Sequence, residues 1–561
     1  MAGAPLPWQD AYPPGLDPAT VPEPFPVHRI VDEAAAAWGD RDALVFRGHR
    51  LRFAALKQAV DRWAAAFAAA GIGAGDRVAL LLPNTAVHLF AFFGALRAGA
   101  TVVHLSPLDA APVLRHKLAD SGARLIVTTN IADTALRAAA LAAEGAVARL
   151  VVADDAAFGP SPLTGPLPDG ERIVAADAFL AAGRAAPPAA EPDLDALALV
   201  QYTGGTTGLP KGAMLTHRNL SSAVASYDLW FAAHGLMRPA SERTLLFLPL
   251  FHIYALTAVM LRSVRNGQCL LIHTRFDPET ALAAIEAGAT SFAGVPTMWI
   301  AIAATPGFET RDLSALRYCA SGGAPLPVEL ARRLKRATGH DILGGWGMTE
   351  TGPAGTNIPP GRADKIGTIG VPLPGIRLDV VALDDPARTL SPGETGELRV
   401  FGRNVTAGYL NRPEETAAAF SDGGLLTGDI GFMDDEGFFT IVDRKKDMIL
   451  SGGFNVYPQM IEQAVYAHPH VEEVLVIGVP DAYRGEAAKA FVKLRDGAPA
   501  LTLEALRAFL ADRLGPHEMP AALELREALP RTAVGKLSKL DLKQQEAARQ
   551  SAAPAAPGSI A

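Results

Sequence analysis

The spacing of apolar and polar residues predicts alternating helices and strands along most of the chain. Residues 61–70 and 86–98 have helical periodicity. The apolar runs at 77–82, 102–105 and 124–128 are short and typical of buried strands. Such alternation favours a doubly wound α/β fold with parallel sheets, and we predict a large N-terminal domain of this class.

Three regions depart from this alternation. Residues 144–192 are rich in Ala, Pro, Asp and Gly, which predicts a loose outer region. Residues 372–400 combine short β-like runs with Gly and Pro, which predicts a small barrel-like subdomain. Helix- and strand-like segments after a charged run at 443–447 predict a compact α+β lid domain. The predicted divisions are 1–443, 444–545 and a disordered tail at 546–561.

Composition limits the classes of function. The chain has 561 residues, too many for one ordinary core, and its net charge of −8 offers no basic surface for nucleic acid. Two cysteines are too few for a disulfide framework and fit a reducing compartment. We expect a cytoplasmic protein, because no secretory signal and no transmembrane run is evident. Peripheral membrane contact and a homodimer are left open.

The stretch 201–212 is the most informative part of the sequence, because an apolar run leads there into glycines, threonines and Lys211. Glycines let backbone N–H groups turn inward, hydroxyls add donors and the lysine adds a positive charge. With a helix predicted to start near 216–219, these groups would form a nest for polyphosphate. The stretch is not a P-loop, since that motif needs Ser or Thr directly after Gly-Lys.

Two further stretches have the chemistry of a nucleotide site. Within 345–351, Trp346 can stack on a base and Thr349 can donate to a phosphate. Glu350 can hold Mg²⁺, which prefers few protein ligands and several phosphate oxygens. In Thr427-Gly428-Asp429, the ionised Asp429 can accept from both hydroxyls of a vicinal diol.

These motifs occur in the order found in the adenylate-forming superfamily of acyl-CoA synthetases, adenylation domains and luciferases, which the chain resembles from residue 24 to about 540. It looks closest to bacterial medium- and long-chain fatty acyl-CoA synthetases. Trp346 departs from the pattern, because the family usually has tyrosine there; stacking survives that change and a hydroxyl contact does not. The resemblance implies a mobile lid that turns about a hinge at Asp443.

The resemblance also implies a role for each candidate residue. Lys536, His252 and Thr349 would be catalytic, with Lys536 bridging the carboxylate and the α-phosphate. Glu350 would be the metal ligand, and Gly452 and Gly453 would border the CoA thiol. The implied ATP- and AMP-binding residues are Thr203, Gly204, Gly205, Thr206, Thr207, Gly208, Lys211, Gly322, Gly323, Ala324, Trp346, Gly347, Met348, Thr349, Asp429 and Arg444. The implied acyl-pocket residues are Phe251, His252, Tyr254, Val295 and Met298.

The implied reaction has two halves: a fatty acid attacks ATP to give acyl-AMP and pyrophosphate, and CoA then displaces AMP. Mg²⁺ would accompany ATP, and CoA would be a co-substrate. The apolar pocket segments contain no carboxylate for an amino-acid ammonium, which argues against amino-acid activation. Three alternatives stay open: an acyl-AMP ligase that loads a carrier protein, a CoA ligase for a dicarboxylic or aryl acid, and an inactive nucleotide- or fatty-acid-binding protein.

Overall fold

The computed structural model describes residues 6–183, 192–203, 210–324, 326–451, 454–481, 483–531 and 537–552. The chain divides into two compact units. Unit 1 comprises Met1–Asp379, Arg399–Leu426 and Asp434–Phe439, and unit 2 comprises Val380–Leu398, Thr427–Met433 and Thr440–Ala561.

The first large sheet of unit 1 has seven strands in the order β7-β6-β5-β3-β4-β8-β9, all parallel except for β9, which runs antiparallel to β8. The predicted buried strands are confirmed as β3, β4 and β5. The prediction that residues 144–192 form a loose outer region is partly wrong, because strands β6 and β7 lie within it and extend this sheet. The bounds are β3 (Arg77–Leu81), β4 (Thr101–Leu105), β5 (Leu125–Thr129), β6 (Arg149–Ala153), β7 (Ile173–Ala175), β8 (Leu197–Thr203) and β9 (Lys211–Thr216).

The second large sheet has nine strands in the order β16-β15-β14-β13-β12-β10-β11-β1-β2. Its centre is parallel, and antiparallel pairs occur only towards its two ends among the described strands. The bounds are β1 (Asp42–Phe46), β2 (His49–Arg52), β10 (Arg243–Leu246), β11 (Cys269–Ile272), β12 (Ser291–Gly294), β13 (Tyr318–Ser321), β14 (Ile342–Trp346), β15 (Thr356–Asn357) and β16 (Val371–Pro372). The predicted doubly wound α/β class is confirmed.

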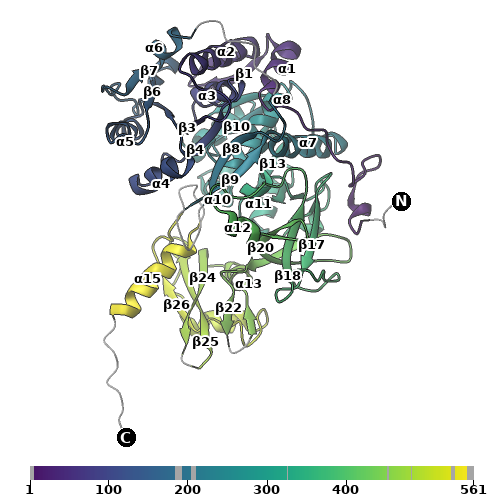
Figure 1. Ribbon diagram of the computed structural model, residues 1–561. Helices are drawn as coiled ribbons and strands as arrows, with labels where there is room; N and C mark the ends of the chain where they lie inside the picture. The colour runs from purple at the N-terminus through teal and green to yellow at the C-terminus, as the bar shows by residue number, and fades with distance from the viewer. Residues whose placement is uncertain are drawn as a thin grey trace. The chain divides into compact units, whose positions relative to one another are not determined.

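Helices pack against these sheets, and α1, α2 and α3 form a group of neighbours (Figure 1, purple to indigo). Every residue of α3 from Ala86 to Leu96 is buried, in a core that also contains side chains of β3 and β10. The α-helices of unit 1 are α1 (Arg29–Trp38), α2 (Phe53–Ala69), α3 (Ala86–Arg97), α4 (Ala111–Ser121), α5 (Ala132–Ala143), α6 (Ala176–Ala181), α7 (His217–Ala233), α8 (Arg262–Arg265), α9 (Pro278–Glu286), α10 (Pro296–Ala304), α11 (Val328–Thr338) and α12 (Pro413–Ala418). Shorter elements are the π-helix η3 (Tyr254–Leu261) and the 3-10 helices η1 (Gln9–Ala11), η2 (Asp155–Phe158), η4 (Phe308–Thr310), η5 (Thr349–Thr351) and η6 (Ala363–Lys365).

A five-stranded sheet stands where the barrel-like subdomain was predicted, in the order β17-β18-β20-β19 with β21 beside β20. Its bounds are β17 (Arg377–Val381), β18 (Gly396–Phe401), β19 (Phe420–Ser421), β20 (Gly424–Met433) and β21 (Phe439–Arg444).

The C-terminal part of unit 2 has the predicted α+β composition. Its sheet has the order β23-β22-β25-β24, with β26 parallel to β25, and helices α13 and α14 bury apolar side chains against it. The predicted tail at 546–561 begins within α15, and residues 553–561 lie outside the described residues. The bounds are β22 (Ile449–Ser451), β23 (Phe454–Val456), α13 (Pro458–Tyr466), β24 (Val471–Asp481), β25 (Gly485–Leu494), α14 (Leu503–Leu510), β26 (Ala522–Leu525) and α15 (Lys539–Ala552).

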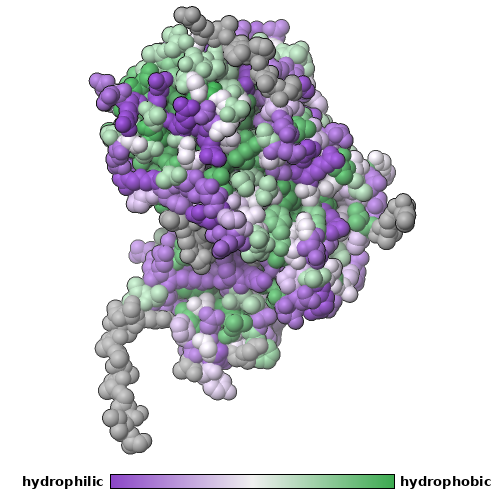
Figure 2. Space-filling view, viewed as in Figure 1, coloured by the Kyte–Doolittle hydropathy of each residue, from purple (hydrophilic) through white to green (hydrophobic). Residues whose placement is uncertain are grey.

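The face drawn in Figure 2 mixes hydrophilic and hydrophobic residues. Within the described ranges, no helix is both long enough and apolar enough to cross a membrane.

Candidate active site

The signature stretch forms the hairpin of β8 and β9. Thr203 and Lys211 are the pair that directly flanks the connecting residues 204–210, and the Thr203 hydroxyl donates to the Lys211 carbonyl at 3.5 Å. Gly204, Gly205, Thr206, Thr207 and Gly208, which we predict to bind phosphate, lie outside the described residues.

The prediction that a helix N-terminus completes the phosphate nest is wrong. Helix α7 does begin at His217, with Thr216 and Asn219 forming a capping box. The six residues of β9 separate it from the loop, however, and a strand of that length spans about 20 Å. Any phosphate nest in this hairpin therefore has to use the loop itself and Lys211.

Tyr409, which is not among the residues predicted from the sequence, contacts two of the candidate residues. Its hydroxyl donates to Oε1 of Glu350 at 2.8 Å, and Nζ of Lys211 lies 5.5 Å from the centre of its ring. Burial and the neighbouring charge of Glu350 raise the pKa of Tyr409, so the hydroxyl stays a donor. The only signal for it in the sequence is a tyrosine after Gly408 and shortly before the Pro413-Glu414 start of α12.

The segment 403–410, which we call the connector, holds this cluster together. The backbone N–H of Thr406 donates to the Glu350 carbonyl at 2.7 Å, and the Thr406 hydroxyl donates to the Met214 carbonyl on β9 at 2.6 Å. The Asn219 amide donates to the carbonyls of Arg403 and Val405, both at 2.8 Å. Glu350 and the β9 strand that carries Lys211 are therefore positioned by one shared segment.

The rest of the 345–351 motif lies around β14 and η5. Gly347 cannot be replaced without rearrangement, since a Cβ there would lie 1.4 Å from the Pro353 carbonyl oxygen. Trp346 is buried with its ring against Gly355, while Met348 and Thr349 are half-buried. Their predicted contacts with nucleotide stay predictions.

Glu350 suits Mg²⁺ as one buried carboxylate, because Mg²⁺ takes one or two carboxylates and completes its shell with phosphate oxygens and water. In the described part of the chain, no group of three or more His, Cys, Asp or Glu could hold a metal ion. A metal bound here would therefore need ligands from the nucleotide.

The predicted AMP-binding residue Gly322 and the predicted acyl pocket meet at Tyr254. A Cβ on Gly322 would lie 3.0 Å from the Tyr254 ring, so the glycine allows this close packing; Gly323 and Ala324 are exposed. His252 accepts the backbone N–H of Tyr254 through Nδ1 at 3.3 Å, which leaves its proton on Nε2 when the ring is neutral. The other predicted acyl-pocket residues, Phe251, Val295 and Met298, are buried.

Unit 2 brings together two of the predicted ATP- and AMP-binding residues. Nε of Arg444 lies 2.5 Å from Oδ1 of the buried Asp429. Asp443, the predicted hinge residue, is also buried, and its carboxylate accepts the backbone N–H groups of Arg444 and Gln459, the latter in the first turn of α13. Burial raises the pKa of Asp443, while Lys539 at 3.9 Å acts in the opposite direction. The predicted residues Gly452, Gly453 and Lys536 lie outside the described residues.

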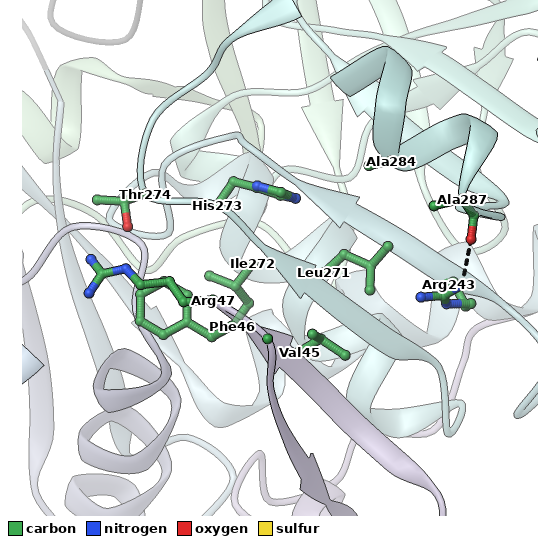
Figure 3. Close-up of a pocket in the computed structure, with 11 residues that line it drawn as sticks. Val45, Phe46, Arg47, Arg243, Leu271, Ile272, His273, Thr274, Ala284 and Ala287 are labelled. Carbon is green, nitrogen blue, oxygen red and sulfur yellow. Dashed lines mark hydrogen bonds between the residues drawn. The ribbon is translucent and has the colours of Figure 1, made fainter. Parts of the chain in front are cut away.

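None of the predicted site residues lines the cavity of about 290 Å³ shown in Figure 3. Both arginines that line it have protein partners: Arg243 donates to the Ala287 carbonyl, and Arg47 forms an ion pair with Asp155. The lining residues are Val45, Phe46, Arg47, Gly48, Arg243, Leu271, Ile272, His273, Thr274, Ala284 and Ala287.

Comparison with known proteins identifies the family. The model of AMP-binding enzymes matches residues 31–410, and the model of the AMP-binding enzyme C-terminal domain matches residues 460–536. The chain belongs to the AMP-binding enzyme family. The long-chain-fatty-acid–CoA ligase of Bacillus subtilis (strain 168) is similar to this AMP-binding enzyme, with 37% identity over 557 residues that cover 96% of this chain and 98% of that protein.

Another similar protein is named for a different acid, and a solved structure has a similar fold. The feruloyl-CoA synthase of an Amycolatopsis species is 39% identical over 504 residues, which cover 89% of this AMP-binding enzyme and 94% of that protein. The crystal structure of ATP-bound MatB from Rhodopseudomonas palustris matches with a TM-score of 0.81 and 28% identity, covering 92% of this chain and 98% of that one.

Proposed function

We propose that this AMP-binding enzyme is an ATP-dependent acid–thiol ligase that converts a medium- or long-chain fatty acid to acyl-CoA through acyl-AMP, releasing pyrophosphate and AMP. The observation that carries this proposal is the 37% identity, over 96% of the chain, to a protein named a long-chain-fatty-acid–CoA ligase. The cluster of Lys211, Tyr409 and Glu350 supports it, because a cation and a buried carboxylate that contact the same tyrosine suit a polyphosphate with its metal ion.

In the first half-reaction, a carboxylate oxygen attacks the α-phosphorus of ATP and the bond to pyrophosphate breaks. Lys211 and the hydroxyls of Thr203, Thr206 and Thr207 would bind the β- and γ-phosphates, and Lys536 would stabilise the developing charge. Glu350 would hold Mg²⁺, which offsets phosphate charge when bound. His252 would orient the acyl carboxylate through its Nε2 proton.

In the second half-reaction, the CoA thiolate attacks the acyl carbonyl carbon and AMP leaves. Asp429 and Arg444 would bind the ribose of the adenylate, and Gly452 and Gly453 would border the thiol. One site has to serve both halves, so the lid (444–545) would turn about Asp443 and remove Lys536 after adenylation. The boundary between 443 and 444, a cytoplasmic location and a homodimer belong to this proposal as predictions.

A ligase for an aryl acid is the second candidate. It is favoured by the 39% identity to a protein named feruloyl-CoA synthase. The predicted pocket residues Phe251, Tyr254, Val295 and Met298 are apolar or aromatic and suit either an alkyl chain or a ring.

A panel of octanoate, dodecanoate, hexadecanoate, ferulate and one dicarboxylate tests the proposal, with AMP formation measured with and without CoA. We expect CoA-dependent AMP formation to be fastest with an alkyl acid. A maximum with ferulate would favour the aryl alternative. Pyrophosphate formation without CoA-dependent AMP release from any acid would contradict the CoA ligase and favour transfer to a carrier protein.

A further inference from the structure

A chain of buried polar side chains crosses the core of unit 1. Nε2 of His88 on α3 lies 3.2 Å from Nε2 of His104 on β4, and Nδ1 of His104 lies 2.9 Å from Oε1 of Gln201 on β8. The Gln201 amide donates to the Phe251 carbonyl at 2.8 Å. His88, His104 and Gln201 are 0%, 1% and 5% exposed in that order, so all three side chains lie within the core.

The hydrogen bonds in this chain have one consistent direction. The carbonyl of Phe251 can only accept, so the NH₂ group of Gln201 has to face it and the Gln201 oxygen has to face His104. His104 must then donate from Nδ1, which leaves its Nε2 as the acceptor for the Nε2 proton of His88. This arrangement places a proton on Nδ1 of His104 and on Nε2 of His88.

The chain of hydrogen bonds ends at the loop that carries His252. Phe251 is the residue before His252, and Gln201 is two residues before the first predicted phosphate-binding residue, Thr203. His104 and Gln201 are paired in register across β4 and β8, so their side chains point to the same face of the sheet. Asn84 fixes the same loop further back, accepting the backbone N–H of Leu250 at 2.8 Å.

We propose that His104, held by His88, is a positioning residue for the acyl carboxylate. Through Gln201 it fixes the Phe251 carbonyl, and thereby the position of His252 relative to the strand from which the phosphate-binding loop departs. The proposal rests on the proposed function, because it assigns His252 to the carboxylic acid. Without the Nδ1 donor, the Gln201 amide can rotate, and the loop that carries Phe251 and His252 is no longer held in one position.

Kinetics of two variants test this role. His104→Leu removes the donor, and we expect kcat/KM for the carboxylic acid to fall about 10–100-fold, the scale of an ångström-sized misplacement, with KM for ATP changed less than about twofold. His104→Asn keeps a side-chain N–H close to the place of Nδ1 and should recover most of that loss. His217→Leu is the matched control, because His217 is a buried histidine that accepts the Val27 N–H elsewhere in unit 1 and should alter stability alone.

Three outcomes would overturn the proposal. The first is an unchanged kcat/KM for the acid in folded His104→Leu, where the single-turnover pyrophosphate burst gives the concentration of active enzyme. The second is an equal loss in His104→Leu and His104→Asn. The third uses wild-type protein labelled with ¹⁵N-histidine, and applies even where a variant does not fold: a His104 ring protonated on Nε2 at pH 7 contradicts the direction derived above. A wild-type protein that forms pyrophosphate with no acid would instead contradict the proposed function.

Discussion

The hydroxyl of Tyr409 donates a 2.8 Å hydrogen bond to the carboxylate of Glu350, 59 residues earlier in the chain. The Lys211 ammonium group faces the ring of the same tyrosine. Tyr409 therefore contacts both a predicted metal ligand and a predicted phosphate ligand.

Tyr409→Phe isolates the contribution of that hydroxyl, because phenylalanine keeps the ring beside Lys211. A hydrogen bond to a charged group contributes about 1.5–3 kcal/mol, so we expect kcat/KM for ATP in acyl-AMP formation to fall at least about tenfold. Tyr12→Phe is the control: it removes a buried hydroxyl that donates to the Pro372 carbonyl, outside the motifs. Equal kinetic effects in the two variants would contradict a specific role for Tyr409.

Glu350→Gln keeps the shape of the side chain and removes its charge. We expect adenylation to slow and to require a higher Mg²⁺ concentration for half-maximal rate, measured by a Mg²⁺ titration of pyrophosphate release. Glu242→Gln is a matched control, because both residues are 6% exposed and Glu242 pairs with Thr290 and Arg317 instead. A Mg²⁺ titration identical to that of the wild type would exclude Glu350 as the ligand.

Lys536→Ala should slow acyl-AMP formation by about 10²–10³-fold, the usual effect of removing one transition-state donor. Thioester formation from supplied acyl-AMP should change much less, since this lysine is proposed to have left the site by then. Single-turnover assays of the two halves measure this difference, with Lys543→Ala, which removes an ion pair to Asp447, as the control. Equal losses in both halves would refute the assignment.

Asp443→Pro restricts the backbone at the proposed hinge, because proline fixes φ and limits the preceding residue. We expect an acyl-AMP burst to persist while thioester formation collapses, as measured by pyrophosphate release and acyl-CoA yield. The carboxylate also caps the first turn of α13, so Asp443→Asn is the necessary control, with a free backbone and altered charge. Retention of both half-reactions in Asp443→Pro would end the hinge proposal.

The buried histidines should make the folded state sensitive to acid. Burial lowers the pKa of His104 to about 4, and burial together with the neighbouring His104 lowers that of His88, with the backbone of Pro83 acting in the opposite direction. As the pH falls, these histidines bind protons in the unfolded chain at a higher pH than in the folded chain. Their contribution to the free energy of unfolding is therefore fully present above about pH 7 and is lost as the pH drops from about 6.5 towards 4.

His104→Asn should flatten this acid dependence. The lowered pKa of His104 alone corresponds to a loss of at most about 3 kcal/mol in the free energy of unfolding between pH 7 and pH 4. Urea unfolding at pH 4–8 measures this loss. His217 and His234 also have a pKa lowered to about 4 by burial, so the difference between variant and wild type is the informative quantity. Parallel curves for the two proteins would contradict a neutral, buried His104.

The sequence was sufficient for the fold class, because the strands of a parallel sheet are short apolar runs that periodicity detects directly. It was also sufficient to find Lys211 and Glu350, since each lies in a dense local motif. It could not find Tyr409 or the pair of His88 and His104, because their roles depend on partners that only the folded chain brings close. A helix N-terminus was wrongly predicted to contribute to the phosphate nest for a related reason. Strand β9 is only six residues long, and it lies between the Gly/Thr-rich stretch and the start of helix α7, both of which have stronger sequence patterns.

The connector has a consequence for exchanging parts between members of this family. It is bonded at once to β9 through Met214, to the start of α7 through Asn219 and to η5 through the Glu350 carbonyl. A hybrid enzyme with a crossover between residues 219 and 403 would take the two sides of the Met214 and Asn219 bonds from different parents, and a crossover between 350 and 403 would also divide the Glu350 bond. Crossovers after the connector, beyond residue 410, leave all of them within one parent and should yield active hybrids far more often.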